Sequence, residues 1–127
     1  MAIPRMKALR GAVLVGADLI DANLSGFDLS RALMSWVDLT GANLAGANLS
    51  GTDLTDAYMQ NSNLSGANLT GANLTGVLLS GASLSGANLT AANLKGAVLT
   101  GATYEDETML PGGFDPDGRG MVRRLRR

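Results

Sequence analysis

Residues 66–76 read GANLTGANLTG, and the same five-residue spacing extends from them in both directions. A Leu, or in three units Met34, Met59 or Tyr104, recurs at every fifth position from Leu14 to Tyr104. The nineteen units cover residues 12–106 without an insertion. Ala lies two positions before the central residue in 14 units. Asn or Asp comes directly before it in 12, Ser or Thr directly after it in 13, and Gly ends the unit in 12.

A period of five does not match the 3.6-residue period of an α-helix, and Gly at a fixed phase would destabilise a long helix at every occurrence. A short, strict repeat instead predicts a solenoid, whose coils bury a continuous core against their neighbours. Within each unit the alternation of Ala, Asn and Leu places side chains inward, outward and inward, as in a strand. The Gly supplies the positive φ that a tight turn requires.

The tandem Ala-(Asn/Asp)-Leu-(Ser/Thr)-Gly units resemble the pentapeptide-repeat family, whose consensus is A(D/N)LXX. The resemblance implies an all-β fold, a right-handed quadrilateral β-helix with four repeats per coil and about 4.75 coils. Residues twenty apart would then stack in columns. We expect an N-terminal cap at 1–11, the β-helix at 12–106, and a C-terminal cap with a basic tail at 107–127. The segment LPGGFDP at 110–116 resembles endings in family members from photosynthetic bacteria.

The composition favours a non-catalytic protein. The chain has no His and no Cys, so neither His-activated nucleophiles nor thiolate or His-ligated metal sites are expected. A Leu-filled β-helix offers no internal pocket, and we predict no enzyme activity, cofactor or metal. No apolar run is long enough for a membrane span. Arg5, Lys7 and Arg10 precede a short apolar run, but that run is in repeat register, so we expect a cytoplasmic protein rather than export.

The charges are unevenly distributed. Six Asp lie between residues 12 and 100 against Arg31 and Lys95, whereas both ends of the chain are basic. Some family members inhibit DNA gyrase, a type II topoisomerase, by mimicking DNA, which requires a dense anionic stripe. Here the predicted columns spread the acids over several faces, so DNA mimicry is the alternative function and not the preferred one. The acidic surface for that alternative comprises Asp18, Asp38, Asp28 and Asp53.

Apolar deviations from the consensus cluster more clearly. Tyr58, Leu78 and Val98 occupy the outward position before the centre and are spaced by twenty, so we expect them to form one column. Leu33 and Trp36 place two further apolar groups on an adjoining face or corner. An apolar surface of this kind marks a contact site for an unknown protein partner or for self-association.

Three alternatives remain open at this stage. The tail residues Met121, Val122 and Leu125, or Phe114, would cover the column if they folded back over it. The Arg residues of the tail would contact nucleic acid or an acidic membrane, although a solvated tail is the more common outcome and we expect neither partner. Regular Ser and Thr ranks also occur on ice-binding solenoids, but here the repeat places them on all four predicted faces.

Overall fold

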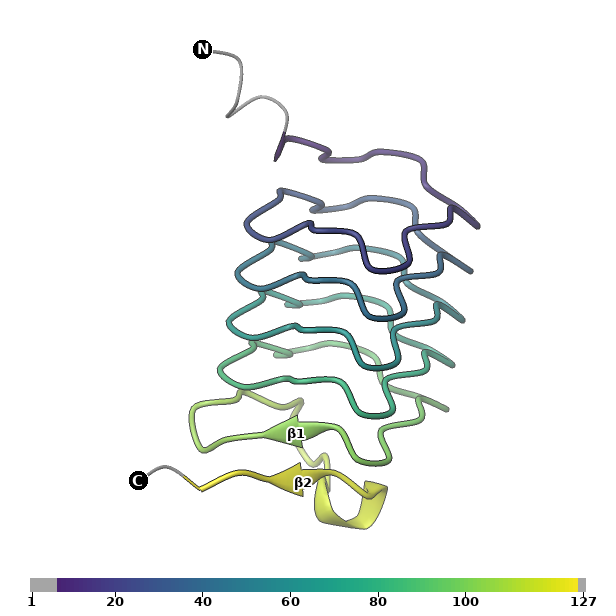
Figure 1. The fold of residues 1–127 in the computed structure, drawn as a ribbon. Helices are drawn as coiled ribbons and strands as arrows, with labels where there is room; N and C mark the ends of the chain where they lie inside the picture. Colours follow the sequence, from purple (N-terminus) through teal and green to yellow (C-terminus); the bar gives the residue numbers. More distant parts are fainter. Residues whose placement is uncertain (1–6, 126–127) are drawn as a thin grey trace.

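The computed structural model describes residues 7–125, which form a stack of similar coils (Figure 1). The backbone pairs in parallel with the chain twenty residues further on, as in the bridges Asn48↔Asn68 and Asn68↔Asn88. Four five-residue units therefore complete one lap before the chain meets itself again. The columns expected from the sequence follow directly from this pairing.

Most of the pairing takes the form of single-residue bridges. The longer elements lie at the C-terminal end: β1 (Thr103–Tyr104), the 3-10 helix η2 (Asp117–Arg119) and β2 (Val122–Arg123). β2 runs parallel to β1, with Val122 paired to Thr103. Residues 7–125 contain no α-helix, and hence none with the length and apolarity to cross a membrane.

Each unit contributes the same backbone hydrogen bonds. The N–H of Leu69 donates to the carbonyl oxygen of Asn88 at 2.7 Å, and the N–H of Asn68 donates to Ala47 at 2.9 Å. A turn bond from Ala67 to the oxygen of Leu64, at 3.0 Å, closes each corner. Gly66 supplies the positive φ of that corner, at 67°. The five-residue period is thus one bridge plus one turn.

The core consists of stacked Leu and Ala side chains. In the central coils both ranks are fully buried, and the two polar residues at Ala positions, Thr52 and Ser62, are buried with them. Their hydroxyl groups donate to the backbone oxygens of Leu49 at 2.6 Å and Met59 at 2.8 Å. Because both hydroxyls are hydrogen-bonded, the small polar side chains are tolerated inside the rod.

The coiled region begins before Ala12. Ala8 bridges to Asp28, and the N–H of Leu9 donates to the same residue's oxygen at 2.8 Å. Residues 7–11 therefore already form a repeat unit within the segment that the sequence assigned to an N-terminal cap. Residues 1–6 of that cap, with Arg5, lie outside the described residues.

The coiled region also continues beyond Asp106. Met109 bridges to Asn88, a separation of 21 residues, so one residue is inserted before the pattern resumes. Thr108 takes the buried Ala position, and its hydroxyl donates to the oxygen of Leu84 at 3.0 Å. Leu110 then packs against the core at the central position. The segment TMLPG at 108–112 is a further unit that the uninterrupted register conceals.

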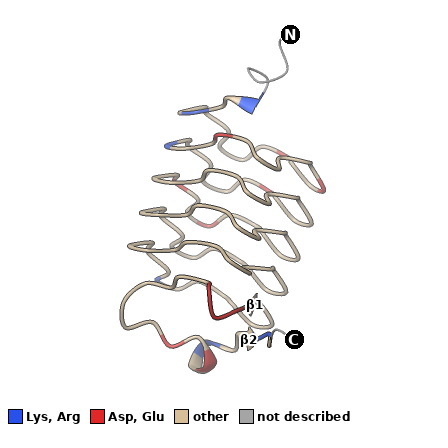
Figure 2. Cartoon of the chain, turned by 90° about the vertical axis from the view of Figure 1, so that its left-hand side faces the viewer, with Lys and Arg blue, Asp and Glu red and all other residues tan. Residues whose placement is uncertain are grey.

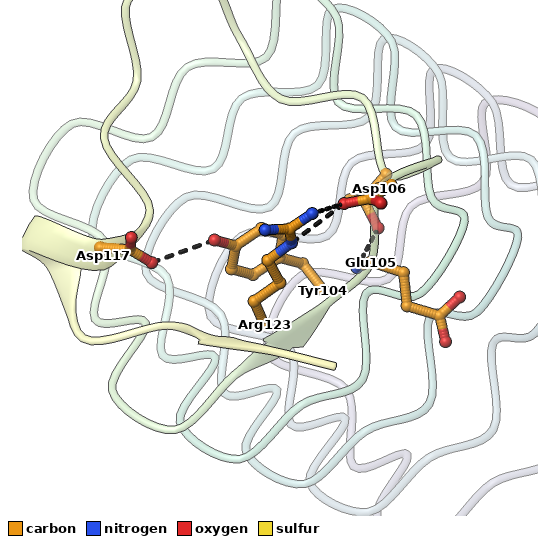
Figure 3. A network of polar contacts seen from close by, with 6 residues as sticks. Tyr104, Glu105, Asp106, Asp117 and Arg123 are labelled. Atoms are coloured by element: carbon orange, nitrogen blue, oxygen red, sulfur yellow. Dashed lines mark hydrogen bonds and ion pairs between the residues drawn. The ribbon is translucent and has the colours of Figure 1, made fainter. Parts of the chain in front are cut away.

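The last coil is closed by a polar network (Figure 3). The Tyr104 hydroxyl donates to Asp117 at 3.0 Å, and Arg123 of β2 forms an ion pair with Asp106. Burial, and then the hydrogen bond to Asp117, raise the pKa of Tyr104 above its ordinary value. The tail forms β2 instead of folding back along the coils, and of Met121, Val122 and Leu125 only Met121 is buried.

Candidate interaction surface

The outward position before each central residue has a defined structural role. In all twelve units with Asn or Asp there, the side-chain Oδ1 accepts the backbone N–H two residues later, at 3.0 to 3.2 Å. Where a Ser or Thr follows, its hydroxyl commonly donates to the same oxygen, as Thr70 does to Asn68 at 2.6 Å. These Asx turns explain both polar ranks of the repeat.

Asp28 shows the electrostatic effect of this turn. The Ser30 hydroxyl donates to its carboxylate at 2.6 Å, and the Ser30 backbone N–H donates at 3.0 Å. These two bonds, the side-chain one first, hold the pKa of the Asp28 carboxyl below its ordinary value.

Five units give up the Asx turn because an apolar residue replaces Asn or Asp. Three of them form one column: Tyr58 bridges to Leu78, and Leu78 bridges to Val98. The backbone of this column is intact, with the N–H of Leu79 donating to the oxygen of Val98 at 2.8 Å. Tyr58 is 37% exposed and Val98 41%, while Leu78 is half-buried between them. We call these three residues the apolar column.

The structure places the chain end on a different face. β2 pairs with β1, in the column of Ser83 and Thr103, one face further along the coil than Val98. Met121 is buried, Val122 and Leu125 are exposed, and Phe114 packs against the core beside Ala92 and Leu94. Within residues 7–125, therefore, no tail residue covers the apolar column.

Leu33 and Trp36 lie apart from that column. Leu33 bridges to Val13 and to Asp53 on the preceding face, and Trp36 occupies the corner between the two faces. Both are about half exposed, at 47% and 55%. Trp36 has a φ of 61°, a conformation in which twelve other units have Gly. Five other non-Gly residues at this phase have a φ of 58° to 61°, so the conformation belongs to the repeat corner, although it is strained for a side chain as bulky as that of Trp36.

Sequence reasoning missed three exposed apolar residues in the coil that precedes Trp36. Val13, Val15 and Ile20 belong to the first coils and are at least half exposed. Val13 bridges to Leu33, and Val15 lies at the same corner as Trp36 in the preceding coil, whereas Ile20 precedes the next corner; we call these five residues the N-terminal patch. The signal was present in the sequence, because Val15 and Ile20 occupy the position that is Ser or Thr in most other units.

The acidic residues do not form a continuous stripe. Asp18 bridges to Asp38, but the next residue in that column is Tyr58. Asp28 and Asp53 lie in two other columns, followed by Asn48 and Asn73. Figure 2 shows the acidic residues spread around the coils, with Lys and Arg near the first and last coils. Among residues 7–125 no three acidic side chains gather where they could hold a metal ion.

Comparison with known families matches the sequence to pentapeptide repeats, in eight copies over residues 8–35, 32–71 and 67–103. Comparison with curated proteins finds no match. Among solved structures, the chain is similar to the pentapeptide repeat protein Rfr23 from the cyanobacterium Cyanothece 51142, with 36% identity and a TM-score of 0.65. That alignment covers 85% of this chain and 65% of Rfr23, so the chain spans less than two thirds of that protein.

Two further structures are similar. The first is AT2G44920, a pentapeptide repeat protein from the Arabidopsis thaliana thylakoid lumen, with 30% identity, a TM-score of 0.61, and coverage of 88% of this chain and 72% of that one. The second is alr5209, a pentapeptide repeat protein from Nostoc PCC 7120, with 33% identity, a TM-score of 0.41, and coverage of 97% and 93%.

Proposed function

This chain belongs to the pentapeptide-repeat family, and from that premise we propose that it is a non-catalytic interaction module presenting a rigid β-helical surface to another protein. The nineteen units of residues 12–106, at four per coil, correspond to about 4.75 coils, which we propose wind in a right-handed sense, and the units at 7–11 and 108–112 extend the stack at its two ends. A cytoplasmic location is part of the same proposal.

The apolar column is the observation that carries this proposal. At its three positions the Asn or Asp side chain of the consensus would form an Asx turn, worth about 1 kcal/mol. The apolar side chains give up that bond and expose apolar area to water instead. Since neither effect stabilises the isolated rod, their alignment on one face is best explained by contact with a partner.

The N-terminal patch supports the same conclusion on an adjoining face. Trp36 combines a large apolar surface with a strained backbone, at a corner where Gly would be accommodated without strain. Trp and Tyr are the residues that contribute most to binding energy in protein interfaces. We propose that Tyr58 and Trp36 anchor the contact, with Leu33, Leu78 and Val98 around them.

Affinity capture from native cells tests this function. We compare the wild-type protein with the double variant Tyr58→Asn and Leu78→Asn, which restores the consensus residue at both positions. Light scattering on the same proteins separates self-association from binding of a different protein. We expect the double variant to remain folded and to lose its bound protein or its self-association.

A matched control uses the opposite face. Asn68→Ser with Asn88→Ser changes two positions of the same phase, ten residues further along, and Ser occurs naturally in this phase at Ser83. This control should retain the partner. If the Tyr58/Leu78 variant binds and associates as the wild type does, the apolar column is not a contact surface.

A further inference from the structure

Among residues 7–125, the C-terminal cap leaves two faces of the last coil without a bridging backbone partner. β2 pairs with the Thr103 column and Met109 pairs with the Asn88 column. The other two columns end at Asn93 and Val98, and no described residue bridges to either from the C-terminal side. The cap therefore closes half of the strand edge that the last coil presents.

At the Asn93 column the unpaired groups are well defined. In earlier coils the carbonyl oxygen of Thr52 accepts the N–H of Asn73, and the N–H of Leu74 donates to the oxygen of Asn93. The equivalent groups of the last coil are the oxygen of Ala92 and the N–H of Leu94, and neither has a backbone or side-chain partner among the described residues. One donor and one acceptor thus remain in the geometry of a parallel β-bridge.

These two residues line an open surface cavity of about 260 Å³ between the last coil and the capping loop. Ala92, Leu94 and Lys95 form its coil side, the loop 111–114 forms its outer side, and Arg119 completes it. This volume lies below the roughly 300 to 1,000 Å³ of pockets for drug-sized ligands, so it would enclose one or two residues of a peptide whose other residues lie outside it.

The lining of the cavity combines apolar and cationic groups. Leu94, Pro111 and Phe114 provide apolar contacts, whereas Lys95 and Arg119 carry positive charge and no acidic residue lines the cavity. Arg119 is held in place, since its guanidinium stacks on the Phe114 ring at 5.2 Å and donates to the oxygen of Ala97 at 2.7 Å. The Lys95 ammonium makes no hydrogen bond or ion pair with the described residues and is exposed.

We propose that this cavity binds an extended peptide segment, which adds one β-bridge to the Asn93 column. The first bound residue would donate its N–H to Ala92 and accept the N–H of Leu94 with its carbonyl oxygen, as Asn93 does one coil earlier. In a parallel bridge the next side chain points inward, towards Leu94 and Phe114, and the third points outward, below Lys95. The preferred sequence is therefore any residue, an apolar residue and an acidic residue.

This site is separate from the apolar column, so either can fail without the other. The probe is the blocked peptide acetyl-Ala-Leu-Asp-amide, titrated into the full-length protein and followed by the backbone amide signals in NMR. We expect the signals of Leu94, Lys95, Gly112 and Gly113 to shift with a dissociation constant in the millimolar range. Acetyl-Ala-Leu-Lys-amide should bind more weakly, because its charge is repelled by Lys95.

Two controls identify the binding mode. N-methylation of the Ala residue in the peptide removes the N–H that Ala92 would accept, and should abolish the shifts. Lys95→Glu should weaken binding of the acidic peptide about fivefold, while Thr90→Glu, at the same repeat phase on the neighbouring corner, should not. The proposal is overturned if the signals of Leu94 and the loop do not move, or if the N-methylated peptide binds equally well.

Discussion

The guanidinium of Arg119 donates a hydrogen bond to the carbonyl oxygen of Ala97, at the place where a backbone N–H of a following coil would donate. In earlier coils of the same column, the oxygens of Ala57 and Val77 accept the N–H groups of Leu78 and Val98. The Arg119 side chain thus takes the place of the backbone N–H that a further coil would provide. The oxygen of Ala97 is therefore hydrogen-bonded although the stack ends there.

We expect Arg119→Met to destabilise the C-terminal end of the rod. Met keeps most of the apolar stem of the side chain but cannot donate to the oxygen of Ala97 or form the cation–π contact with Phe114. The free energy of unfolding should therefore fall by about 1–2 kcal/mol. Urea unfolding measures the change, and hydrogen exchange should show faster exchange in β1 and β2. Arg124→Met, at an exposed position, serves as the control, and an equal effect of both variants would contradict this role of Arg119.

Replacing a consensus Asn by an apolar residue at the outward position should lower stability, whereas the reverse replacement should not. Asn68→Val removes the two bonds that Asn68 accepts from Thr70 and should lower the free energy of unfolding by about 1 kcal/mol. Val98→Asn creates the same acceptor beside Thr100 and should not lower it. Thermal and urea unfolding of the pair test this directly. A large loss of stability in Val98→Asn would show that Val98 serves the fold and not a partner.

The loss of stability caused by a Gly→Ala substitution at a corner should depend on the side chain that is stacked against that glycine. Gly46 has a φ of 67° and open space around an added Cβ, so Gly46→Ala should cost about 1 kcal/mol for backbone strain alone. An added Cβ at Gly76 would also collide with the Asp56 carboxylate, so Gly76→Ala should cost more. Adding Asp56→Gly should recover the difference in a double-mutant cycle. Independent, additive effects of the two changes would refute the steric explanation.

The pKa of Asp28 should depend on Ser30. Ser30→Ala removes the first of the two bonds that lower this pKa, so an NMR titration should find it closer to its ordinary value. Because the folded-state pKa is depressed, the stabilisation is present at neutral pH and is lost as the pH falls through the folded-state value. The stability difference between wild type and Ser30→Ala should shrink over that range. Ser50→Ala, one coil further and bonded to Asn48, should leave the Asp28 pKa unchanged.

We expect no inhibition of DNA gyrase. A DNA mimic requires a long anionic stripe, and the longest acidic column here is the pair Asp18 and Asp38, after which Tyr58 follows. A supercoiling assay with micromolar protein measures this. Inhibition that disappears in Asp18→Asn with Asp38→Asn would instead support DNA mimicry and displace the interaction surface as the main function.

Much of the candidate surface could be predicted from the spacing. Tyr58, Leu78 and Val98 are twenty apart, and the bridges confirm that they lie in one column. The unit at 108–112 could not be found in the same way, because an inserted residue before Met109 shifts the register by one. After such an insertion the residues no longer match the five-residue register, so the spacing does not predict the unit. The backbone accommodates the extra residue in a corner and keeps the bridge from Met109 to Asn88.

The sequence by itself determined the coil. A strict five-residue period places the same residue types at the same position of every turn, so the inward Leu and Ala, the Asx turns and the columns follow from local chemistry repeated many times. Only the tertiary structure decided how the last coil ends: which columns β2 and Met109 cover, and that the oxygen of Ala92 and the N–H of Leu94 have no hydrogen-bond partner among residues 7–125. The reason is that the cap has no repeat. Its path is set by non-local contacts, such as those of Arg119 with Ala97 and of Tyr104 with Asp117, which no periodicity in the sequence specifies.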